Sequence, residues 1–234
     1  MSKSFNVVIA TAGRPTLQRM IDSISPQLTE IDYLTIIWDC EPRELTVNSS
    51  CQVIHIHNPE PLGYWGHGSR TRWQDELPGD YLMNGDDDDI YSPTAMETVR
   101  AHCTEHKLYF FQYSVQDTRV PREHVVAIGN VGTPTGVYPK LDNMPKWEFV
   151  YSGDGEFYTA LSKRLPYEFI DKVIYLVRPE SHREAIKAAV QVPEQIECTC
   201  GAKTNIEYNA ILNMYEGYCN RCDKTSRPQM KEDD

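Results

Sequence analysis

The sequence has no run of about 18 apolar residues, so we expect no transmembrane helix. Its opening segment, MSKSFNVVIATAGR, has too short an apolar run for a signal peptide, and we expect a cytoplasmic protein without a membrane anchor. Basic residues are also scarce, because 23 of them face 34 acidic residues and leave a formal charge of −11. This balance disfavours long-range attraction to bare nucleic acid or to an anionic membrane.

Seven cysteines are present, and four of them gather near the C-terminus in the pattern Cys-x-Cys, eighteen residues that begin with Gly, Cys-x-x-Cys. Without a signal peptide, a reducing compartment and a metal site fit this pattern better than disulfides, although disulfides and free thiols stay open. The arrangement resembles a zinc ribbon, which implies a structural Zn²⁺ because four thiolates leave no open coordination position. The implied ligands are Cys198, Cys200, Cys219 and Cys222.

A domain boundary is expected close to Pro193, with one domain at 1–190 and the cysteine module at 191–234. Basic residues cluster around the second cysteine pair of this module. They suit a phosphate backbone, a protein partner or plain solvation, and they are Arg221, Lys224, Arg227 and Lys231. The remaining cysteines, Cys40, Cys51 and Cys103, are expected as small core residues.

The first half of the chain alternates short apolar runs with helical patterns, which predicts an α/β fold with a doubly wound, mostly parallel sheet. The expected strands are residues 5–10, 33–39, 52–57 and 80–84, and the expected helices are residues 15–24, 69–77 and 92–106. The second half is expected to be mixed α+β. Its strands are predicted at 108–115, 124–131 and 169–178, and its helices from about 155 and at 179–190.

Ligands of such sheets lie beyond the carboxyl ends of the strands. The sequence places Asp39, the glycine-containing segment 63–68 and the acidic run 86–89 on that edge. The run follows a buried strand in YLMNGDDDDI and returns at once to apolar residues, which is unusual for a solvated loop. An EF-hand is unlikely in the absence of its spacing and terminal glutamate. Two interpretations stay open: an acidic turn without a ligand, and a Mg²⁺ or Mn²⁺ site completed by substrate phosphates.

The layout Asp86-Asp87-Asp88-Asp89-Ile90-Tyr91-Ser92-Pro93 resembles the Asp-x-Asp motif of GT-A fold glycosyltransferases, in particular the inverting family 2. The resemblance implies that Asp86 lies near the ribose or the metal and that Asp88 binds the metal bridging the diphosphate. Asp87 would belong to the donor site with its side chain turned away from the ion, and Asp89 would support the others.

Three further segments resemble the same family. VVIATAGRPTLQRMIDSI matches its first strand and nucleotide loop, with Thr11 and Arg14 in the loop, and IIWDCE places Asp39 where the family contacts uracil or ribose. GYWGHGSRTRWQDELPGDYLMNG resembles its Gly-x-x-x-Ala-Arg-Asn helix, with Arg70 sixteen residues before Asp86. Thr71 replaces the family's asparagine, which leaves that contact in doubt. Each arginine could also be a surface ion-pair partner, and Asp39 could simply cap a turn.

Inverting transfer needs a general base within hydrogen-bond reach of the acceptor hydroxyl. In YSGDGEFYTAL, a carboxylate in a glycine-flanked turn before a helix resembles the family's acceptor-side acidic motif. Asp154 is the predicted base and Glu156 the second choice, while a plain helix cap is the alternative for Asp154. Stacking surfaces for a sugar or a base, or equally core residues, are Trp65, Trp147 and Tyr151.

These observations predict a soluble enzyme that uses Mn²⁺ or Mg²⁺ and transfers a sugar from a nucleotide sugar, expected to be UDP-linked. The acceptor is open between a glycan or lipid-linked sugar and a hydroxymethylated pyrimidine in DNA, since compact viral enzymes of this kind modify DNA. A nucleotidyltransferase is the first alternative, although no glycine-rich, lysine-containing phosphate loop follows the first strand. A non-catalytic nucleotide-sugar-binding protein with a zinc-ribbon interaction surface is the second.

Overall fold

The computed structural model describes residues 2–115 and 118–179, and beyond them the backbone of five short strands. The chain divides into two compact units, Met1–His182 and Arg183–Asp234. The predicted boundary at 190 falls further along the chain and stays a prediction. In the second unit, the backbone forms one antiparallel pair and one antiparallel three-stranded sheet: β10 (Gln195–Glu197) with β11 (Lys203–Asn205), and β12 (Glu207–Asn209), β13 (Met214–Cys219) and β14 (Lys224–Ser226).

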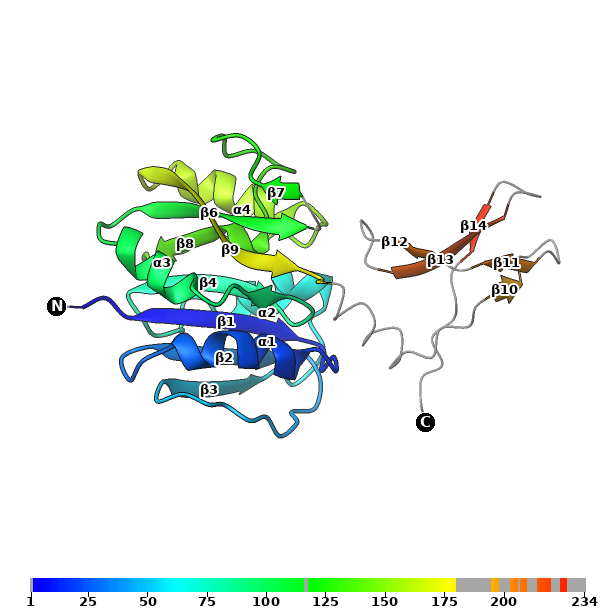
Figure 1. Ribbon diagram of the computed structural model, residues 1–234, viewed down its shortest axis with the longest axis horizontal. Helices are drawn as coiled ribbons and strands as arrows, with labels where there is room; N and C mark the ends of the chain where they lie inside the picture. The colour runs from blue at the N-terminus through cyan, green and yellow to red at the C-terminus, as the bar shows by residue number, and fades with distance from the viewer. Residues whose placement is uncertain are drawn as a thin grey trace. The chain divides into compact units, whose positions relative to one another are not determined.

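A nine-stranded sheet forms the centre of the first unit (Figure 1), in the order β3-β2-β1-β4-β8-β6-β9-β5 with β7 paired to β6. Strands β1 to β4 run parallel, as predicted, whereas β8 runs antiparallel to both of its neighbours. The strands are β1 (Phe5–Thr11), β2 (Tyr33–Trp38), β3 (Gln52–His57), β4 (Tyr81–Asp86), β5 (Ile90–Tyr91), β6 (Leu108–Val115), β7 (Thr118–Val120), β8 (Gly136–Pro139) and β9 (Tyr167–Val177).

Successive side chains of a buried strand point to opposite faces, so both faces of this sheet are apolar and need to be covered by helices. On β1, Val7 and Ile9 belong to one apolar cluster and Val8 to the other. Helices α1 (Leu17–Ile24) and α3 (Ala95–His102) supply the first cluster, and α4 (Gly153–Ser162) supplies the second. The doubly wound α/β prediction is therefore confirmed for this unit.

Three predicted elements differ from the structure. Residues 124–131 do not form a strand; the Asn130 side chain donates to the carbonyls of Glu123 and Val125 and folds the segment into a loop. The helix expected from Ser92 begins only at Ala95, because residues 90–91 continue as β5 and the Ser92 amide donates to Ile174 of β9. Helix α2 (His67–Trp73) also starts and ends earlier than expected.

The carboxyl ends of the parallel strands meet at one edge of the sheet. Ala10 of β1 pairs with Asp86 of β4, and Thr11 pairs with Trp38 of β2. Asp39 follows directly, and its amide donates to the Thr11 carbonyl. The fold thus brings the ends of three strands, and the predicted donor-site residues on them, to neighbouring positions.

Candidate active site

The acidic run forms a tight turn at the end of β4. The Asp89 amide donates to the Asp86 carbonyl, and Asp87, Asp88 and Asp89 are each only 2% exposed. Asp86 remains accessible, with about a third of its side chain exposed. Burial of three adjacent carboxyls rules out a solvated acidic turn, because charged groups are buried only when partners offset them.

The first partners come from the loop after β1. The Thr11 hydroxyl donates to Asp87 Oδ2 at 2.6 Å, and Arg14 Nη1 lies 2.9 Å from Asp87 Oδ1 and 3.1 Å from Asp88 Oδ2. Burial raises the pKa of Asp87, and Arg14 opposes that shift. Asp87 therefore ties the acidic turn to the loop after β1, and its orientation relative to an ion stays a prediction.

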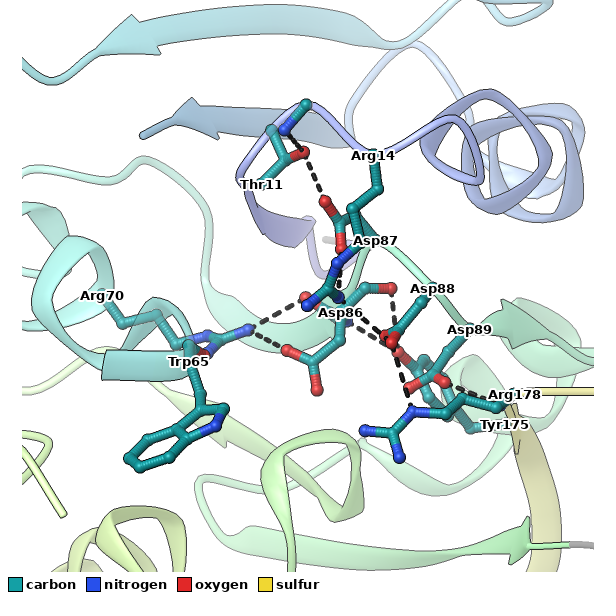
Figure 2. Close-up of polar contacts among 12 residues, drawn as sticks. Thr11, Arg14, Trp65, Arg70, Asp86, Asp87, Asp88, Asp89, Tyr175 and Arg178 are labelled. Carbon is teal, nitrogen blue, oxygen red and sulfur yellow. Dashed lines mark hydrogen bonds and ion pairs between the residues drawn. The ribbon is translucent and has the colours of Figure 1, made fainter. Parts of the chain in front are cut away.

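Arg70 supplies the second partner from helix α2. Its guanidinium is 1% exposed, and Nη2 lies 2.6 Å from Asp86 Oδ1 and donates to the Gly85 carbonyl. Nη1 donates to the Trp65 carbonyl at 3.0 Å. One guanidinium thus joins the loop before α2 to the end of β4, as Figure 2 shows.

A third arginine, which the sequence reasoning missed, closes the site from the end of β9. Arg178 Nε lies 3.1 Å from Asp88 Oδ2, and the Arg178 amide donates to Asp89 Oδ1. Tyr175 of the same strand accepts a hydrogen bond from the Asp86 amide at 2.7 Å. The only signal in the sequence was the position of Arg178 at the end of a late strand, and Figure 2 places it across Asp88 from Arg14.

Asp89 lies deepest in the turn. Burial raises its pKa well above the usual value for an aspartate, and the charges of Asp88 and Asp86 raise it further. The Arg178 amide stabilises the ionised form only in part. This environment opposes ionisation of Asp89, and its supporting role stays a prediction.

Asp39 lies at the same edge but bonds within the protein. Oδ1 accepts from the Leu62 amide and Oδ2 from the Gly63 amide, both at 2.6 Å, and Asn58 donates to Oδ1 at 2.8 Å. These bonds fix the loop that leads into α2. A contact of Asp39 with the nucleotide stays a prediction.

The two candidate bases differ in their surroundings. Asp154 is half-buried, and its carboxylate accepts from the Thr133 amide at 3.0 Å and from the Gly155 amide at 2.7 Å. Burial raises its pKa, and the charge of Asp86 raises it further. Glu156 is exposed. Ser152 is the N-cap of α4 and Asp154 lies within its first turn, so the interpretation of Asp154 as a plain helix cap is wrong, and its role as base stays a prediction.

The three aromatic candidates separate in the same way. Trp147 is 1% exposed and stacks on Phe157 with 4.2 Å between ring centroids, so it is a core residue and cannot receive a ligand. Trp65 and Tyr151 are each more than half exposed, and their rings meet edge to face with centroids 5.6 Å apart.

The acidic turn can supply part of a divalent-cation site. In residues 2–115 and 118–179, no group of three histidine, cysteine, aspartate or glutamate side chains is arranged to hold a metal. Asp86 and Asp88 offer two carboxylates, which matches the way Mg²⁺ is held by one or two carboxylates together with substrate phosphates. The donor set fits an ion that arrives with a diphosphate and does not fit a closed protein site.

The four predicted zinc ligands lie outside this description. Cys198, Cys200 and Cys222 fall outside the described residues, and Cys219 is described only as the last backbone position of β13. Structural zinc stays a prediction. Cys51 and Cys103 are buried and Cys40 is half-buried, close to expectation. None of the helices in the described part has the length and apolar content needed to span a bilayer.

Comparison with solved structures decides the fold. The chain superimposes on S. aureus TarS 1-349 with a TM-score of 0.62 and 15% identity, over 80% of this chain and 64% of TarS 1-349. The first unit has a GT-A-like fold. The superposition on TarS 1-349 in complex with UDP-GlcNAc has a TM-score of 0.59 and 14% sequence identity, and it covers 74% of this chain and 58% of that one.

The chain also superimposes on a mannosyltransferase from Pyrobaculum calidifontis in complex with GDP-Man and Mn²⁺. The TM-score is 0.54 at 10% sequence identity, and the match covers 81% of this chain and 64% of the mannosyltransferase. The chain thus spans less than two thirds of the length of these glycosyltransferases. No family model and no curated protein matches the sequence.

Proposed function

We propose that this chain is an inverting glycosyltransferase that transfers a sugar from a uridine-diphosphate sugar to an acceptor hydroxyl with the help of Mn²⁺ or Mg²⁺. The observation that carries the proposal is the acidic turn at the carboxyl edge of a GT-A-like sheet, surrounded by Arg14, Arg70 and Arg178. Three guanidinium groups beside carboxylates suit a ligand that brings both a cation and phosphate charge.

The residues divide the chemistry between donor and acceptor. Asp154 takes the proton of the acceptor hydroxyl as its oxygen attacks the anomeric carbon from the face opposite the diphosphate. The bond to the diphosphate breaks, and its electron pair leaves with the nucleoside diphosphate. Arg14, Arg70 and Arg178 face the charge that develops there. A single displacement inverts the anomeric configuration.

Asp86 and Asp88 would hold the divalent cation. When bound, such an ion neutralises charge on the departing diphosphate. Asp86 is suited to this role because its carboxylate is accessible while Arg70 fixes one of its oxygens. Asp88 is engaged by Arg14 and Arg178, so both arginines have to share it with the cation or release it.

Titration calorimetry of UDP, with and without Mn²⁺, tests the donor site in wild-type protein and in Asp88→Asn. We expect Mn²⁺ to tighten UDP binding at least about tenfold, equivalent to about 1.4 kcal/mol, and Asp88→Asn to remove most of this gain. Asp142→Asn is the matched control, because Asp142 is exposed and does not belong to the acidic turn. If neither Mn²⁺ nor the Asp88→Asn substitution changes the affinity for UDP, the assignment of a metal site to the acidic turn is wrong.

Hydrolysis of UDP-sugars, with water as the acceptor, then separates an enzyme from a binding protein. Slow, Mn²⁺-dependent release of the free sugar supports a transferase. Binding without any turnover would favour a non-catalytic nucleotide-sugar-binding protein, and release of pyrophosphate from a nucleoside triphosphate would favour a nucleotidyltransferase.

A further inference from the structure

Beside the acidic turn, two loops present four large aromatic side chains that the core does not use. Tyr64 and Trp65 come from the short 3-10 turn η2 (Tyr64–Gly66), and Phe149 and Tyr151 come from the segment before α4. All four are between 49% and 58% exposed. Tyr64 stacks on Phe149 at 4.9 Å, and Trp65 meets Tyr151 edge to face, so they form one cluster, called here the aromatic platform.

The backbone under the platform is held in an unfavourable conformation. Tyr64 and Trp65 both have φ of 54°, in the left-handed region that bulky side chains rarely adopt. Their side chains remain half exposed, so packing in the core does not explain this conformation. Strain of this kind concentrates at functional sites, where the surrounding structure maintains it.

Hydrogen bonds hold each loop of the platform in place. Asp39 accepts from the Leu62 and Gly63 amides, and Arg70 binds the Trp65 carbonyl. Across the platform, Thr71 exchanges two hydrogen bonds with the Trp147 backbone, and the His67 ring bonds to the Glu148 carbonyl. Helix α2 therefore fixes both loops, and the surface is formed before any ligand arrives.

The platform adjoins the proposed reaction centre. Arg70 contacts the Trp65 carbonyl with one nitrogen and Asp86 with another (Figure 2). On the other loop, Tyr151 precedes Asp154 by three residues. A Cβ built on Gly132 would lie 3.0 Å from the Tyr113 hydroxyl and 3.5 Å from Asp154 Oδ2, so Tyr113 lies close to the proposed base. Arg70 thus links the platform to Asp86, and the second loop leads from the platform to the proposed base.

Charge around the platform selects among ligands with an apolar face. Segment 147–156 carries three acidic residues and no basic one, and segment 63–68 has His67 as its only acidic or basic residue. Burial and the charge of Arg70 lower the pKa of His67 to about 4, so it is neutral at physiological pH. The nearest base along the chain, Lys146, is paired with Asp75 at 2.9 Å. From these two segments, a phosphodiester backbone would meet carboxylates and no charged basic side chain.

The chemistry of the four rings narrows the class further. Two of them, Tyr64 and Trp65, carry a hydroxyl or an indole N–H, which needs a partner when it is covered. An acyl chain offers no such partner, whereas a sugar ring offers an apolar C–H face bordered by hydroxyls. Resting on the function proposed above, we propose that the platform binds the uncharged pyranose ring of a saccharide acceptor.

Collisional quenching of tryptophan fluorescence by acrylamide tests this directly. Of the four tryptophans, Trp65 is the strongly exposed one, because Trp38 and Trp147 are buried and Trp73 is half-buried. The probes are cellobiose, maltose and N,N′-diacetylchitobiose at millimolar concentrations. We expect at least one disaccharide to shield the quenchable component, and Trp65→Phe to remove that component.

Matched variants locate the binding. Tyr151→Ala is expected to weaken disaccharide binding about tenfold or more, whereas Tyr167→Ala leaves it unchanged. Tyr167 is 47% exposed at the start of β9, where it pairs with Leu108 at the opposite end of that strand from Arg178. Equal losses in both variants overturn the assignment.

Three other outcomes overturn the inference. Shielding by a single-stranded oligonucleotide and by no disaccharide assigns the platform to a nucleobase, and shielding only by phosphatidylcholine vesicles assigns it to a lipid. No shielding by any probe removes the ligand role altogether. UDP binding is measured on the same samples to distinguish failure of this inference from failure of the proposed function. Intact UDP binding without disaccharide shielding refutes saccharide binding by the platform and does not affect the proposed donor site.

Discussion

Arg70 and Asp86 form a 2.6 Å ion pair in which the arginine is 1% exposed and the aspartate keeps a third of its side chain accessible. The same guanidinium holds the carbonyls of Trp65 and Gly85. A single side chain therefore positions the aromatic platform and the first carboxylate of the acidic turn together. This geometry uses the planar fork of arginine, which a lysine does not reproduce.

Arg70→Lys should therefore damage both stability and donor binding although it keeps the charge. A lysine leaves at least one buried carbonyl without its donor, at about 1–3 kcal/mol for each group. We expect the free energy of unfolding in urea to fall by about 2 kcal/mol or more, and UDP affinity to fall with it. Arg72→Lys on the same helix is the control, since Arg72 is exposed, and it should change neither quantity. Equal effects of both variants would contradict this role for Arg70.

The arrangement of Arg70 depends on a glycine at position 66. Its φ is +80°, and a Cβ there would lie 2.8 Å from Ala10 Cβ and 2.9 Å from Arg70 Nη1. Gly66→Ala should therefore lose the left-handed preference of glycine, about 1–2 kcal/mol, and also displace Arg70. Gly129→Ala isolates the first effect, because Gly129 has φ of +81° and nothing within 4 Å of its Cβ position.

Thermal unfolding and UDP titration distinguish the two glycines. Both variants should melt at lower temperature than the wild type, but only Gly66→Ala should weaken UDP binding. If Gly129→Ala weakens UDP binding as much, the effect is a general loss of stability and the link through Arg70 is wrong.

Much of the acidic site could be predicted because it follows from strand polarity. Apolar runs at 5–10, 33–39 and 52–57 became β1, β2 and β3 nearly residue for residue. Parallel strands bring their carboxyl ends to one edge, so the loop after β1 and the acidic turn after β4 had to meet. Arg14, Arg70 and the four aspartates come together for that reason.

The rest depends on pairings between residues far apart in sequence. Tyr175 and Arg178 reach the acidic turn because β9 pairs with β6 through two register shifts and with β5 beyond it, which no local pattern encodes. Asn130 makes a loop of an apolar stretch by binding backbone carbonyls, which outweighs strand propensity. The sequence left Trp147 open between a stacking surface and the core, and its hydrogen bonds with Thr71 and Gln74 fix it in the core.

The proposed base gives a prediction about pH. Burial raises the pKa of Asp154 above its usual value, and the nearby charge of Asp86 raises it further. A base works only when deprotonated, so UDP-sugar hydrolysis should fall as pH drops through this raised pKa, at higher pH than for an ordinary aspartate. Asp154→Asn should keep UDP affinity, lower the rate about 10²–10⁴-fold and remove this limb of the pH profile.

Glu156→Gln is the matched control for that experiment, because Glu156 lies two positions along the same helix and is exposed. It should retain the rate and the acidic limb. A normal rate in Asp154→Asn, or loss of the limb in Glu156→Gln, would transfer the role of base to Glu156.

At the opposite end of the sheet, Asp32 gives a prediction about stability alone. Its carboxylate is fully buried and accepts from Arg100 at 2.6 Å, from Thr29 and from the Phe5 amide. Burial by itself would raise the pKa of Asp32, but these bonds outweigh it and lower the pKa below its usual value. Removing the charge from one partner of such a pair is destabilising, so Asp32→Asn should lower the free energy of unfolding at pH 7 by about 2–4 kcal/mol.

The sign of the pH dependence follows from the lowered pKa. The ionised carboxylate stabilises the fold fully above the unfolded-state pKa of about 4, and this contribution disappears as pH falls through the lower folded-state value. Urea unfolding of wild type and Asp32→Asn at a series of pH values should therefore show a stability difference that is constant near neutrality and shrinks below pH of about 4. Asp22→Asn, an exposed position on α1, should show no such difference. A gap between wild type and Asp32→Asn that persists unchanged into acid would mean that the side chain acts through its shape and amide-like hydrogen bonds, and that its charge contributes little.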